Sequence, residues 1–556
     1  MVKHSRTDVL VIGGSGAALR AALEAKKHVD EVLVVSKGVV GKSGCFAVSE
    51  GYYDAPFGHV DAKDNPEAYF KDIVIGGAYI NNQKLVEALV SEASQRMLDL
   101  VGYGVNFMKT DDRFHQIRVG GHTYPRVCLL SPLKPKCGVT LTKTLAEKAR
   151  RESVKLLENI MVTTILTKGK SAVGAMGFNR KDGEFQVFSS KTTVLATGGT
   201  GRLYMHTNNP VGVTGDGYAM AMHAGAELVD MEFVQFYPTM SLSPTPGFLV
   251  LPSVFPDGAE LLNSLGEKFM FKYDPEKGHL STRDKMSRAI LLEVMGGRGV
   301  GGGVYLNYAT MPREVIEKTH RSDLNLFLNN RVDIRKTPIV VSPAPHFCMG
   351  GVRINERCET SLQNLYAAGE VAGGVHGANR IPGNAYTESQ VFGARAGRYA
   401  GEKATFTTFE EPDKSQVEQQ IEGVKAFRKH DGQTPSEVIR ELRAVMWNYV
   451  GVVRNGEGLR KALLELNRIR SEVLPKVKAE NPEELVSAVE LSNMLDVGQA
   501  VAESALLRTE TRGAHYRTDC PNENDKRWLK NIVISLKNGK LLKETTPTVA
   551  TRIKIQ

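Results

Sequence analysis

The first apolar stretches of the chain predict a strand, a tight turn and a helix. A β-branched run over residues 8–12 ends at a cluster of glycines, and an Ala- and Leu-rich stretch over residues 17–27 follows it. A second apolar run at residues 31–35 supplies the next strand, so this segment has the pattern of a βαβ unit. Residues 159–189 then alternate apolar and polar positions between short turns, which is typical of a β-meander.

Further along, the pattern changes twice. Short buried-type strands are expected at residues 193–196, which run into the glycine-rich stretch at 197–201, and at residues 365–369, which end in glycine. Between them, residues 236–344 consist of loop-like stretches with short helices, which indicates an inserted unit. Amphipathic helical periodicity then dominates, and we expect four helices, over residues 417–430, 435–450, 456–479 and 483–510.

These patterns predict an α/β protein of about three folded units, as a length of 556 residues suggests. The first unit is a Rossmann-like dinucleotide-binding domain with a β-meander, formed by residues 1–235 and 345–405. An inserted α+β capping domain covers residues 236–344. A C-terminal helical domain follows at residues 413–530, and residues 531–556 form a tail.

Composition and charge argue against several classes of function. The chain carries 71 Lys and Arg against 62 Asp and Glu, a net charge of +9, and its basic residues are scattered. A nucleic-acid-binding surface would require a stripe of Lys and Arg with interleaved aromatics, which the sequence lacks. No run of 18 or more apolar residues occurs, so we expect no direct membrane insertion. The N-terminal residues run into the first strand without a signal peptide, which favours a cytoplasmic protein.

The six cysteines show no spacing typical of a metal site. They are widely separated, without a CxxC pair or a cluster with histidine, which predicts reduced thiols and no zinc or iron–sulfur centre within this chain. An electron-transfer cluster, where one is needed, would have to be carried by a partner.

The glycine-rich turn at residues 13–16 is a weak signal on its own. A pyrophosphate needs backbone N–H groups at a helix N-terminus, and the three glycines permit that approach. The key positions of the dinucleotide fingerprint are nevertheless Gly13, Ser15 and Ala18, and Ser36 stands where an NAD-binding protein has an acidic residue. A tight turn without a ligand stays open at this point.

Six distant segments read together are far more specific. They are VLATGGTGRLY at 194–204, TGDGYAMAMHAGAELVDMEFVQFYPT at 214–239, STRDKMSRAI at 281–290, SPAPHFCMGG at 342–351, NLYAAGEVAGGVHGANRIPGNAYTESQVFGARAG at 364–397 and RTETRGAHYRTD at 508–519. In this order, with the opening βαβ unit, they resemble the succinate dehydrogenase/fumarate reductase flavoprotein family, which includes L-aspartate oxidases. The resemblance covers nearly the whole chain.

The resemblance implies an FAD-binding domain and the residues that would hold FAD in an extended form. The pyrophosphate and adenosine end would lie against Gly13, Gly14, Ser15, Gly16, Ser36 and Lys37. The second segment corresponds to Thr197, Gly198 and Asp216, and the segment beside the ribityl chain and isoalloxazine to Glu370, Asn384 and Ala385. Many relatives attach FAD through a histidine in an R-S-H-T context. Here Ser43 and Gly44 occupy that stretch, so we expect noncovalent FAD.

The resemblance also implies the catalytic residues. The family reaction adds a hydride and a proton across a C=C bond flanked by carboxylates, which requires cations and one acid. Arg380 and His346 match positions that bind the substrate carboxylates, and the planar fork of arginine suits a bidentate grip. Arg283 matches the family's proton donor, and a place in the first turn of a helix would ease proton release from a group of high pKa. Asp284 would anchor its loop.

Two departures from the family pattern concern the substrate. The histidine of the QFHPT motif is Tyr237 here, which can donate a hydrogen bond to a carboxylate but carries no charge. The loop that usually reads TEGxRGEGG is replaced at residues 251–259, where Pro252 and Phe255 stand in place of a glutamate and an arginine of the proton relay. Either Asp257, Glu260 or water supplies protons instead, or the substrate differs.

We therefore predict the FAD-containing catalytic subunit of a fumarate reductase or succinate dehydrogenase, which interconverts the small dicarboxylates fumarate and succinate and receives electrons through an iron–sulfur partner subunit. The chain is similar in style to cytoplasmic, thiol-dependent archaeal fumarate reductases, whose partner oxidises coenzyme M and coenzyme B. Two alternatives stay open: an L-aspartate oxidase or a reductase of another unsaturated acid, and a flavin-binding subunit that relays electrons without dicarboxylate chemistry.

Overall fold

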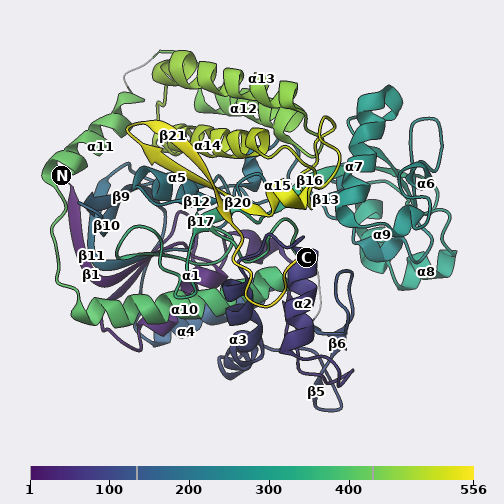
Figure 1. Ribbon diagram of the computed structural model, residues 1–556, viewed down its shortest axis with the longest axis horizontal. Helices are drawn as coiled ribbons and strands as arrows, with labels where there is room; N and C mark the ends of the chain where they lie inside the picture. Colours follow the sequence, from purple (N-terminus) through teal and green to yellow (C-terminus); the bar gives the residue numbers. More distant parts are fainter. Residues whose placement is uncertain (1, 133–135, 429–430, 556) are drawn as a thin grey trace.

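A seven-stranded sheet forms the base of the larger part of the molecule (Figure 1). The computed structural model describes residues 2–132, 136–428 and 431–555. The strand order is β8-β2-β1-β11-β10-β9, and β18 also pairs with β11. Strands β8, β2, β1, β11 and β18 are parallel, whereas β10 runs antiparallel to both of its neighbours. The bounds are β1 Lys3–Ile12, β2 Val32–Val35, β8 Lys155–Leu157, β9 Ile160–Lys168, β10 Ser171–Asn179, β11 Phe185–Leu195 and β18 Leu365–Ala367.

The predicted βαβ unit is present at the start of this sheet. Helix α1 (Gly16–Ala25) connects β1 to β2, which pair in parallel with Val9 opposite Val32. Residues 9–12 of β1 are all buried, as expected of a strand with both faces covered. The carboxyl ends of β1, β2 and β11 therefore meet at the edge where α1 begins, which is where a dinucleotide binds in such folds.

The β-meander is formed by β9, β10 and β11. The sequence patterns suggested a separate strand at residues 193–196, but β11 runs without interruption to Leu195. Its first half pairs with β10 and its last residues pair with β18, while β1 follows it along nearly the whole length. One long strand thus connects the meander to the dinucleotide-binding edge.

The inserted segment folds around a four-stranded antiparallel sheet of order β13-β16-β15-β14. The chain leaves along β13 (Val234–Ser243) and returns along β16 (Ile339–Cys348), and these two strands pair with each other. We call residues 244–338, between them, the cap. Figure 1 shows the cap in teal, to one side of the remaining chain. It contains β14 Glu260–Leu262, β15 Val304–Asn307, α6 Met270–Tyr273, α7 Arg283–Glu293, α8 Arg313–Lys318 and α9 Arg321–Asn329.

The cap has a hydrophobic core of its own. Residues that include Leu261, Ile290, Leu306 and Phe327 are buried against one another in a cluster separate from the main one. The sequence patterns predicted loops and short helices here, and the sheet of the cap was missed.

The helical segment near the C-terminus agrees closely with its predicted elements. Its helices are α11 Lys414–Ala426, α12 Pro435–Val450, α13 Gly456–Arg468 and α14 Pro482–Leu507. Helix α12 begins with proline at its first position and a capping box between Thr434 and Glu437. Helix α13 ends earlier than predicted and continues as a π turn and a 3-10 turn to Lys476. The predicted end of the first helix, residue 430, lies outside the described residues.

The tail forms a hairpin that joins a second sheet. Strands β20 (Lys530–Lys537) and β21 (Lys540–Pro547) pair over their whole lengths. Strand β20 also pairs with β12, so the hairpin forms one edge of a sheet of order β19-β17-β12-β20-β21. Its other members are β12 Leu228–Val229, β17 Gly351–Arg353 and β19 Ala372–Gly373. The end of the chain is thereby attached to strands that come much earlier in the sequence.

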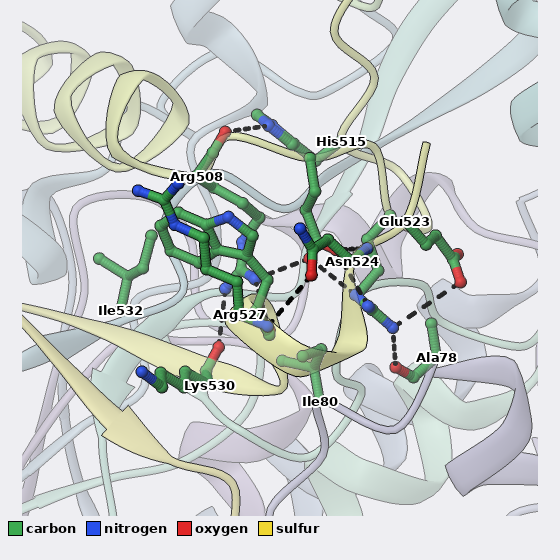
Figure 2. A network of polar contacts seen from close by, with 12 residues as sticks. Ala78, Ile80, Arg508, His515, Glu523, Asn524, Arg527, Lys530 and Ile532 are labelled. Carbon is green, nitrogen blue, oxygen red and sulfur yellow. Dashed lines mark hydrogen bonds and ion pairs between the residues drawn. The ribbon is translucent and has the colours of Figure 1, made fainter. Parts of the chain in front are cut away.

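A buried polar network fixes the segment between α14 and β20 (Figure 2). Arg508 donates to the carbonyls of Trp528 and Lys530, and its Nε lies 2.6 Å from Glu232 Oε1. Arg512 donates to the carbonyl of Ala78 at 3.2 Å. These contacts connect the helical segment to the residues before β13 and to the loop after α2 (Pro66–Gly76).

The remaining elements complete the main body of the molecule. The helices are α2 Pro66–Gly76, α3 Gln83–Gly102, α4 Gly138–Arg151, α5 Asp216–His223, α10 Asn384–Phe406 and α15 Asp525–Trp528. The strands are β3 Tyr52–Asp54, β4 Lys109–Thr110, β5 Arg113–Phe114, β6 Gln116–Ile117 and β7 Val127–Leu129. Among the described residues, no helix combines the length and the apolar character required to cross a bilayer.

Candidate functional site

A cavity of about 890 Å³ extends from the carboxyl ends of the main sheet to the base of the cap. Its walls come from the β1–α1 turn, the end of β2, the start of α5, strands β13 and β16, the cap, the start of α10 and α14. This volume lies near the upper end of the range for ligand pockets. The cavity therefore has room for a long ligand along the sheet edge.

The glycine turn forms one wall, and its geometry requires glycine. Gly13 has φ of +135°, and a Cβ added there would lie 2.1 Å from the carbonyl oxygen of Ala196. A Cβ on Gly14 would lie 2.4 Å from Ser36 Oγ. The N-terminus of α1 opens beside this turn, and Ser15 Oγ is buried without a hydrogen-bond partner. Backbone N–H groups at a helix N-terminus next to an unpartnered hydroxyl fit an anionic group such as a pyrophosphate.

Lys37 marks the far end of the same wall. Its Nζ lies 2.5 Å from Asp216, 2.7 Å from Glu490 and 3.0 Å from the hydroxyl of Thr214. Burial opposes the charge of Lys37, but the two carboxylates raise its pKa. The predicted cofactor residues Lys37 and Asp216 are thus brought together, and Glu490 of α14 joins them.

The other predicted cofactor residues are distributed along the cavity with one exception. Those that line it are Gly13, Gly14, Ser15, Gly16, Ser36, Ser43, Gly44, Thr197, Gly198, Glu370 and Ala385. Asn384 is fully buried behind the wall, where its side-chain oxygen accepts a hydrogen bond from the hydroxyl of Tyr69.

Three further polar side chains line the cavity. Thr197 Oγ1 has no partner, and burial raises the pKa of Glu370 to about 7. Cys45 also lines the cavity, and burial raises the pKa of its thiol. Such a thiol is poorly suited to act as a nucleophile.

Four residues were predicted to bind substrate or to donate a proton. The side chains of three of them, Arg283, Tyr237 and His346, lie close together. The Arg283 guanidinium carbon lies 4.8 Å from the centre of the Tyr237 ring, which is 5.2 Å from the His346 ring. Arg380, the fourth, lines the cavity with them. It is only 6% exposed and donates to Gln235 Oε1 at 3.0 Å and to the Ile381 carbonyl at 3.1 Å. These residues form what we call the cationic end of the cavity.

The two arginines of the cationic end interact with carboxyl groups only at longer range. Over the described part of the chain, no carboxylate forms an ion pair with Arg283 or Arg380, and Arg380 Nε has no hydrogen-bond partner. Burial, together with the charge of Arg283, lowers the pKa of Arg380 to about 10. Burial, with both arginines, holds the pKa of His346 far below its usual value, so this imidazole is neutral. Two cations and a neutral hydrogen-bonding ring suit a small dianion.

Helix α7 positions Arg283 as its first residue, after the N-cap Thr282. The next residue, Asp284, does not line the cavity, and its Oδ2 lies 3.4 Å from Arg288 one turn later. In the altered loop, Phe255 is buried in the core of the cap. Asp257 pairs with His320 at 2.7 Å and Glu260 pairs with Lys268 at 2.6 Å. Neither of these acids is among the residues that line the cavity.

Among the lining residues that were not predicted from the sequence, two lie under the influence of Arg283. Glu50 and Tyr52 lie in the wall of the cavity, and the charge of Arg283 acts on the pKa of both. No local pattern distinguishes Glu50 from a surface acid, so sequence reasoning had no signal for it.

Comparison with known proteins identifies the family. A family model described as "FAD binding domain" matches residues 8–385, and one described as "Fumarate reductase flavoprotein C-term" matches residues 439–556. The chain belongs to the succinate dehydrogenase/fumarate reductase flavoprotein family. Within this family, an uncharacterised FAD-dependent oxidoreductase of Methanocaldococcus jannaschii is 43% identical over 95% of the chain and 96% of the relative.

Two further members are informative. One subunit of the fumarate reductase (CoM/CoB) of Methanothermobacter marburgensis is 41% identical over 95% of the chain and 97% of that protein. The solved structure of Mycobacterium smegmatis Sdh1 in complex with UQ1 matches with a TM-score of 0.92 at 33% identity and covers 100% of this chain and 96% of that one. The resemblance, the α/β fold class and the FAD cofactor predicted from the sequence are confirmed. The protein is an FAD-dependent oxidoreductase of the fumarate reductase/succinate dehydrogenase type.

The residues of the cavity fit FAD. The glycine cradle at α1 suits the pyrophosphate, and Ser36, Lys37 and Asp216 lie at the end where the adenosine would bind. The unpartnered Thr197 hydroxyl and the start of α10 line the section that leads to the cationic end. A flavin bound along this wall would place its ring system beside the arginines that could hold a substrate.

Proposed function

We propose that this protein catalyses the interconversion of fumarate and succinate. The observation that carries this proposal is the pair of unpaired guanidiniums, Arg283 and Arg380, beside neutral His346 at one end of the FAD cavity. Fumarate carries two carboxylates on either side of a C=C bond, so it requires two separate anion-binding groups and one acid. The cationic end supplies both.

Each residue has a distinct part in the proposed reaction. Arg380 holds one carboxylate through its free guanidinium edge, since its other N–H groups already donate to Gln235 and to the chain. His346 donates a hydrogen bond to the other carboxylate. Bound FAD, once it had been reduced by two electrons, would supply the hydride that adds to one carbon of the double bond. Arg283 donates a proton to the neighbouring carbon, and the first turn of α7, which disfavours a cation, assists its release.

We propose that FAD is held without a covalent bond. Gly44 has φ of +80°, and a Cβ added to it would lie 3.2 Å from Ser15. A histidine at this position would be strained, whereas glycine adopts the conformation freely. Cys45, the next residue, has a thiol of raised pKa and is a poor group for flavin attachment.

An iron–sulfur protein is the partner that we propose. The relative from Methanothermobacter marburgensis is named as one subunit of a CoM/CoB fumarate reductase, which supports a multisubunit enzyme here as well. We extend the same analogy to the electron source and propose thiols such as coenzyme M and coenzyme B, oxidised on the partner.

The test is oxidation of a chemically reduced viologen dye by fumarate, catalysed by the FAD-loaded protein. Arg283→Ala should lower kcat by about 1,000-fold, because it removes the acid. Lys285→Ala is the matched control, since Lys285 lies on the same helix, is exposed and lies outside the cavity. A wild-type protein that fumarate does not reoxidise, or an Arg283→Ala variant with an undiminished rate, would contradict the proposal.

A further inference from the structure

Glu50 faces the cationic end although it belongs to a different part of the chain from Arg283. Its backbone is fixed just before β3, because the Cys137 thiol donates to the Glu50 carbonyl at 2.9 Å and the Leu130 N–H donates to the Gly51 carbonyl at 3.1 Å. Tyr52, the first residue of β3, lines the cavity beside it and hydrogen-bonds the Glu50 carboxyl. The side chain of Glu50 is half-buried and lines the cavity.

Of the five carboxylic acids that line the cavity in the described part of the chain, only Glu50 lies near Arg283. Asp216 and Glu490 are paired with Lys37 at the opposite end. Glu370 accepts a hydrogen bond from the Cys348 N–H, and the arginine whose charge acts on its pKa is Arg380 rather than Arg283. The fifth, Glu483, lies in the first turn of α14.

Arg283 needs a proton source if it acts as an acid. A guanidinium that has given a proton to substrate is left neutral and cannot act again until a nearby group restores it. The acids of the altered loop cannot do this directly, because Asp257 and Glu260 are paired elsewhere in the cap and do not reach the cavity.

We propose that Glu50 returns a proton to Arg283 after each turnover. This inference rests on the proposed fumarate reduction. Arg283 transfers one proton to the substrate carbon and becomes a neutral guanidine. The carboxylic acid of Glu50 does not contact Arg283 directly, so it gives its proton to that nitrogen through an intervening water molecule. This transfer restores the guanidinium and leaves Glu50 as a carboxylate. Solvent protonates the carboxylate again, so each cycle consumes one solvent proton by this route and Glu50 ends unchanged.

The electrostatic surroundings of Glu50 support this role. Burial and the charge of Asp323 in the cap raise its pKa to about 7, against the opposing effects of Arg283 and the hydrogen bond from Tyr52. A proton carrier works best when its pKa lies near the working pH. Three tyrosines also interact with Glu50, and all three stay neutral because their pKa is raised: Tyr52, Tyr237 and Tyr386.

The pairing also depends on the position of the cap. Glu50 precedes β3 in the main body, whereas Arg283 and Asp323 belong to α7 and α9 of the cap. The proton route is therefore complete only while the cap lies against the main body.

The experiment compares FAD-loaded wild type with Glu50→Gln, which keeps the shape and the hydrogen bond with Tyr52 but has no acidic proton. Oxidation of reduced viologen by fumarate should show kcat lowered by about 100-fold with KM nearly unchanged. Glu50→Asp, which keeps an acid, should recover part of the rate. Glu260→Gln, in an acid of the cap outside the cavity, should behave as wild type. FAD content and the binding of malonate, followed by the flavin absorbance, should be the same in all four proteins.

The pH dependence separates a proton source from a structural residue. In wild type, kcat should fall as the pH rises above about 7, where Glu50 loses its proton, and this fall should be absent in Glu50→Gln. A Glu50→Gln variant with wild-type kcat and the same fall with pH would overturn the inference while leaving fumarate reduction intact. A wild type that binds malonate but is not reoxidised by fumarate would refute the reaction, and the relay with it.

Discussion

Replacing Arg508 by methionine would leave a carboxylate unpaired in the interior of the protein. The side chains of Arg508 and Glu232 are both fully buried, and Nε lies 2.6 Å from Oε1. Glu232 Oε2 already has no hydrogen-bond partner. Two other carboxylates lie near Arg508. Glu510 keeps its contacts with Arg512, and Asp230 keeps the hydrogen bonds that it accepts from Asn531 and Ile532, so Glu232 bears most of the loss.

The size of the effect follows from these contacts. Breaking a buried ion pair by removing one partner costs about 3–5 kcal/mol, because the remaining charge is uncompensated. The carbonyls of Trp528 and Lys530 also lose a donor, at roughly 1 kcal/mol each. We therefore expect the free energy of unfolding to fall by about 5–7 kcal/mol in Arg508→Met.

Urea unfolding followed by tryptophan fluorescence measures this loss. Trp528 is a suitable reporter, because its ring lies 5.3 Å from the Arg508 guanidinium and the chain has only two tryptophans. Adding Glu232→Gln to Arg508→Met should restore more than half of the loss, since it removes the unpaired charge. Arg313→Met, which breaks an exposed pair with Glu317, is the control and should cost less than about 1 kcal/mol. A double variant no more stable than Arg508→Met would refute the electrostatic reasoning.

Two further predictions concern the cofactor and the pH dependence of stability. Acid precipitation of the purified holoenzyme should release all FAD into the supernatant, measured by its absorbance, and flavin that stays with the pellet would show a covalent bond despite Gly44. Burial lowers the pKa of His122 to about 4, below its unfolded value of 6.5. The unfolded chain therefore binds a proton first on acidification, and stability should fall by about 3 kcal/mol between pH 6.5 and pH 4. His122→Asn should flatten this fall in urea unfolding, whereas parallel curves for the two proteins would contradict the assignment.

Elements with local signals could be predicted from the sequence. Helix α12 begins and ends where its periodicity indicated, because Thr434, Pro435 and Glu437 encode its start within four residues. Strand β16 gives the opposite case. Pro343 and Pro345 lack the N–H group of a strand. The strand forms through pairing with β15 and with β13, which lies about 100 residues earlier and pairs with several irregularities in register. Such long-range pairing leaves no mark in a local window.

The candidate site also contains residues that local motifs identify and residues whose place depends on long-range contacts. Arg283, Tyr237, His346 and Arg380 could be named from ordered motifs, and the structure places all four on one cavity. Glu50 could not, because its relation to Arg283 depends on a contact between segments more than 200 residues apart. Nor could the sequence indicate that Asn384 lies behind the wall, since its neighbour Ala385 lines the cavity.

The adjacent positions of β13 and β16 have a consequence for how this enzyme could change. Because the chain enters and leaves the cap on two paired strands, the cap is an insertion whose ends lie side by side, and such insertions can be exchanged as units. Tyr237 and His346 lie on the strands themselves and Arg380 lies in the main body. Of these residues and Arg283, an exchanged cap would therefore replace only Arg283. Evolution, or a designer, could thus alter the acid of the reaction while retaining the groups that hold the substrate.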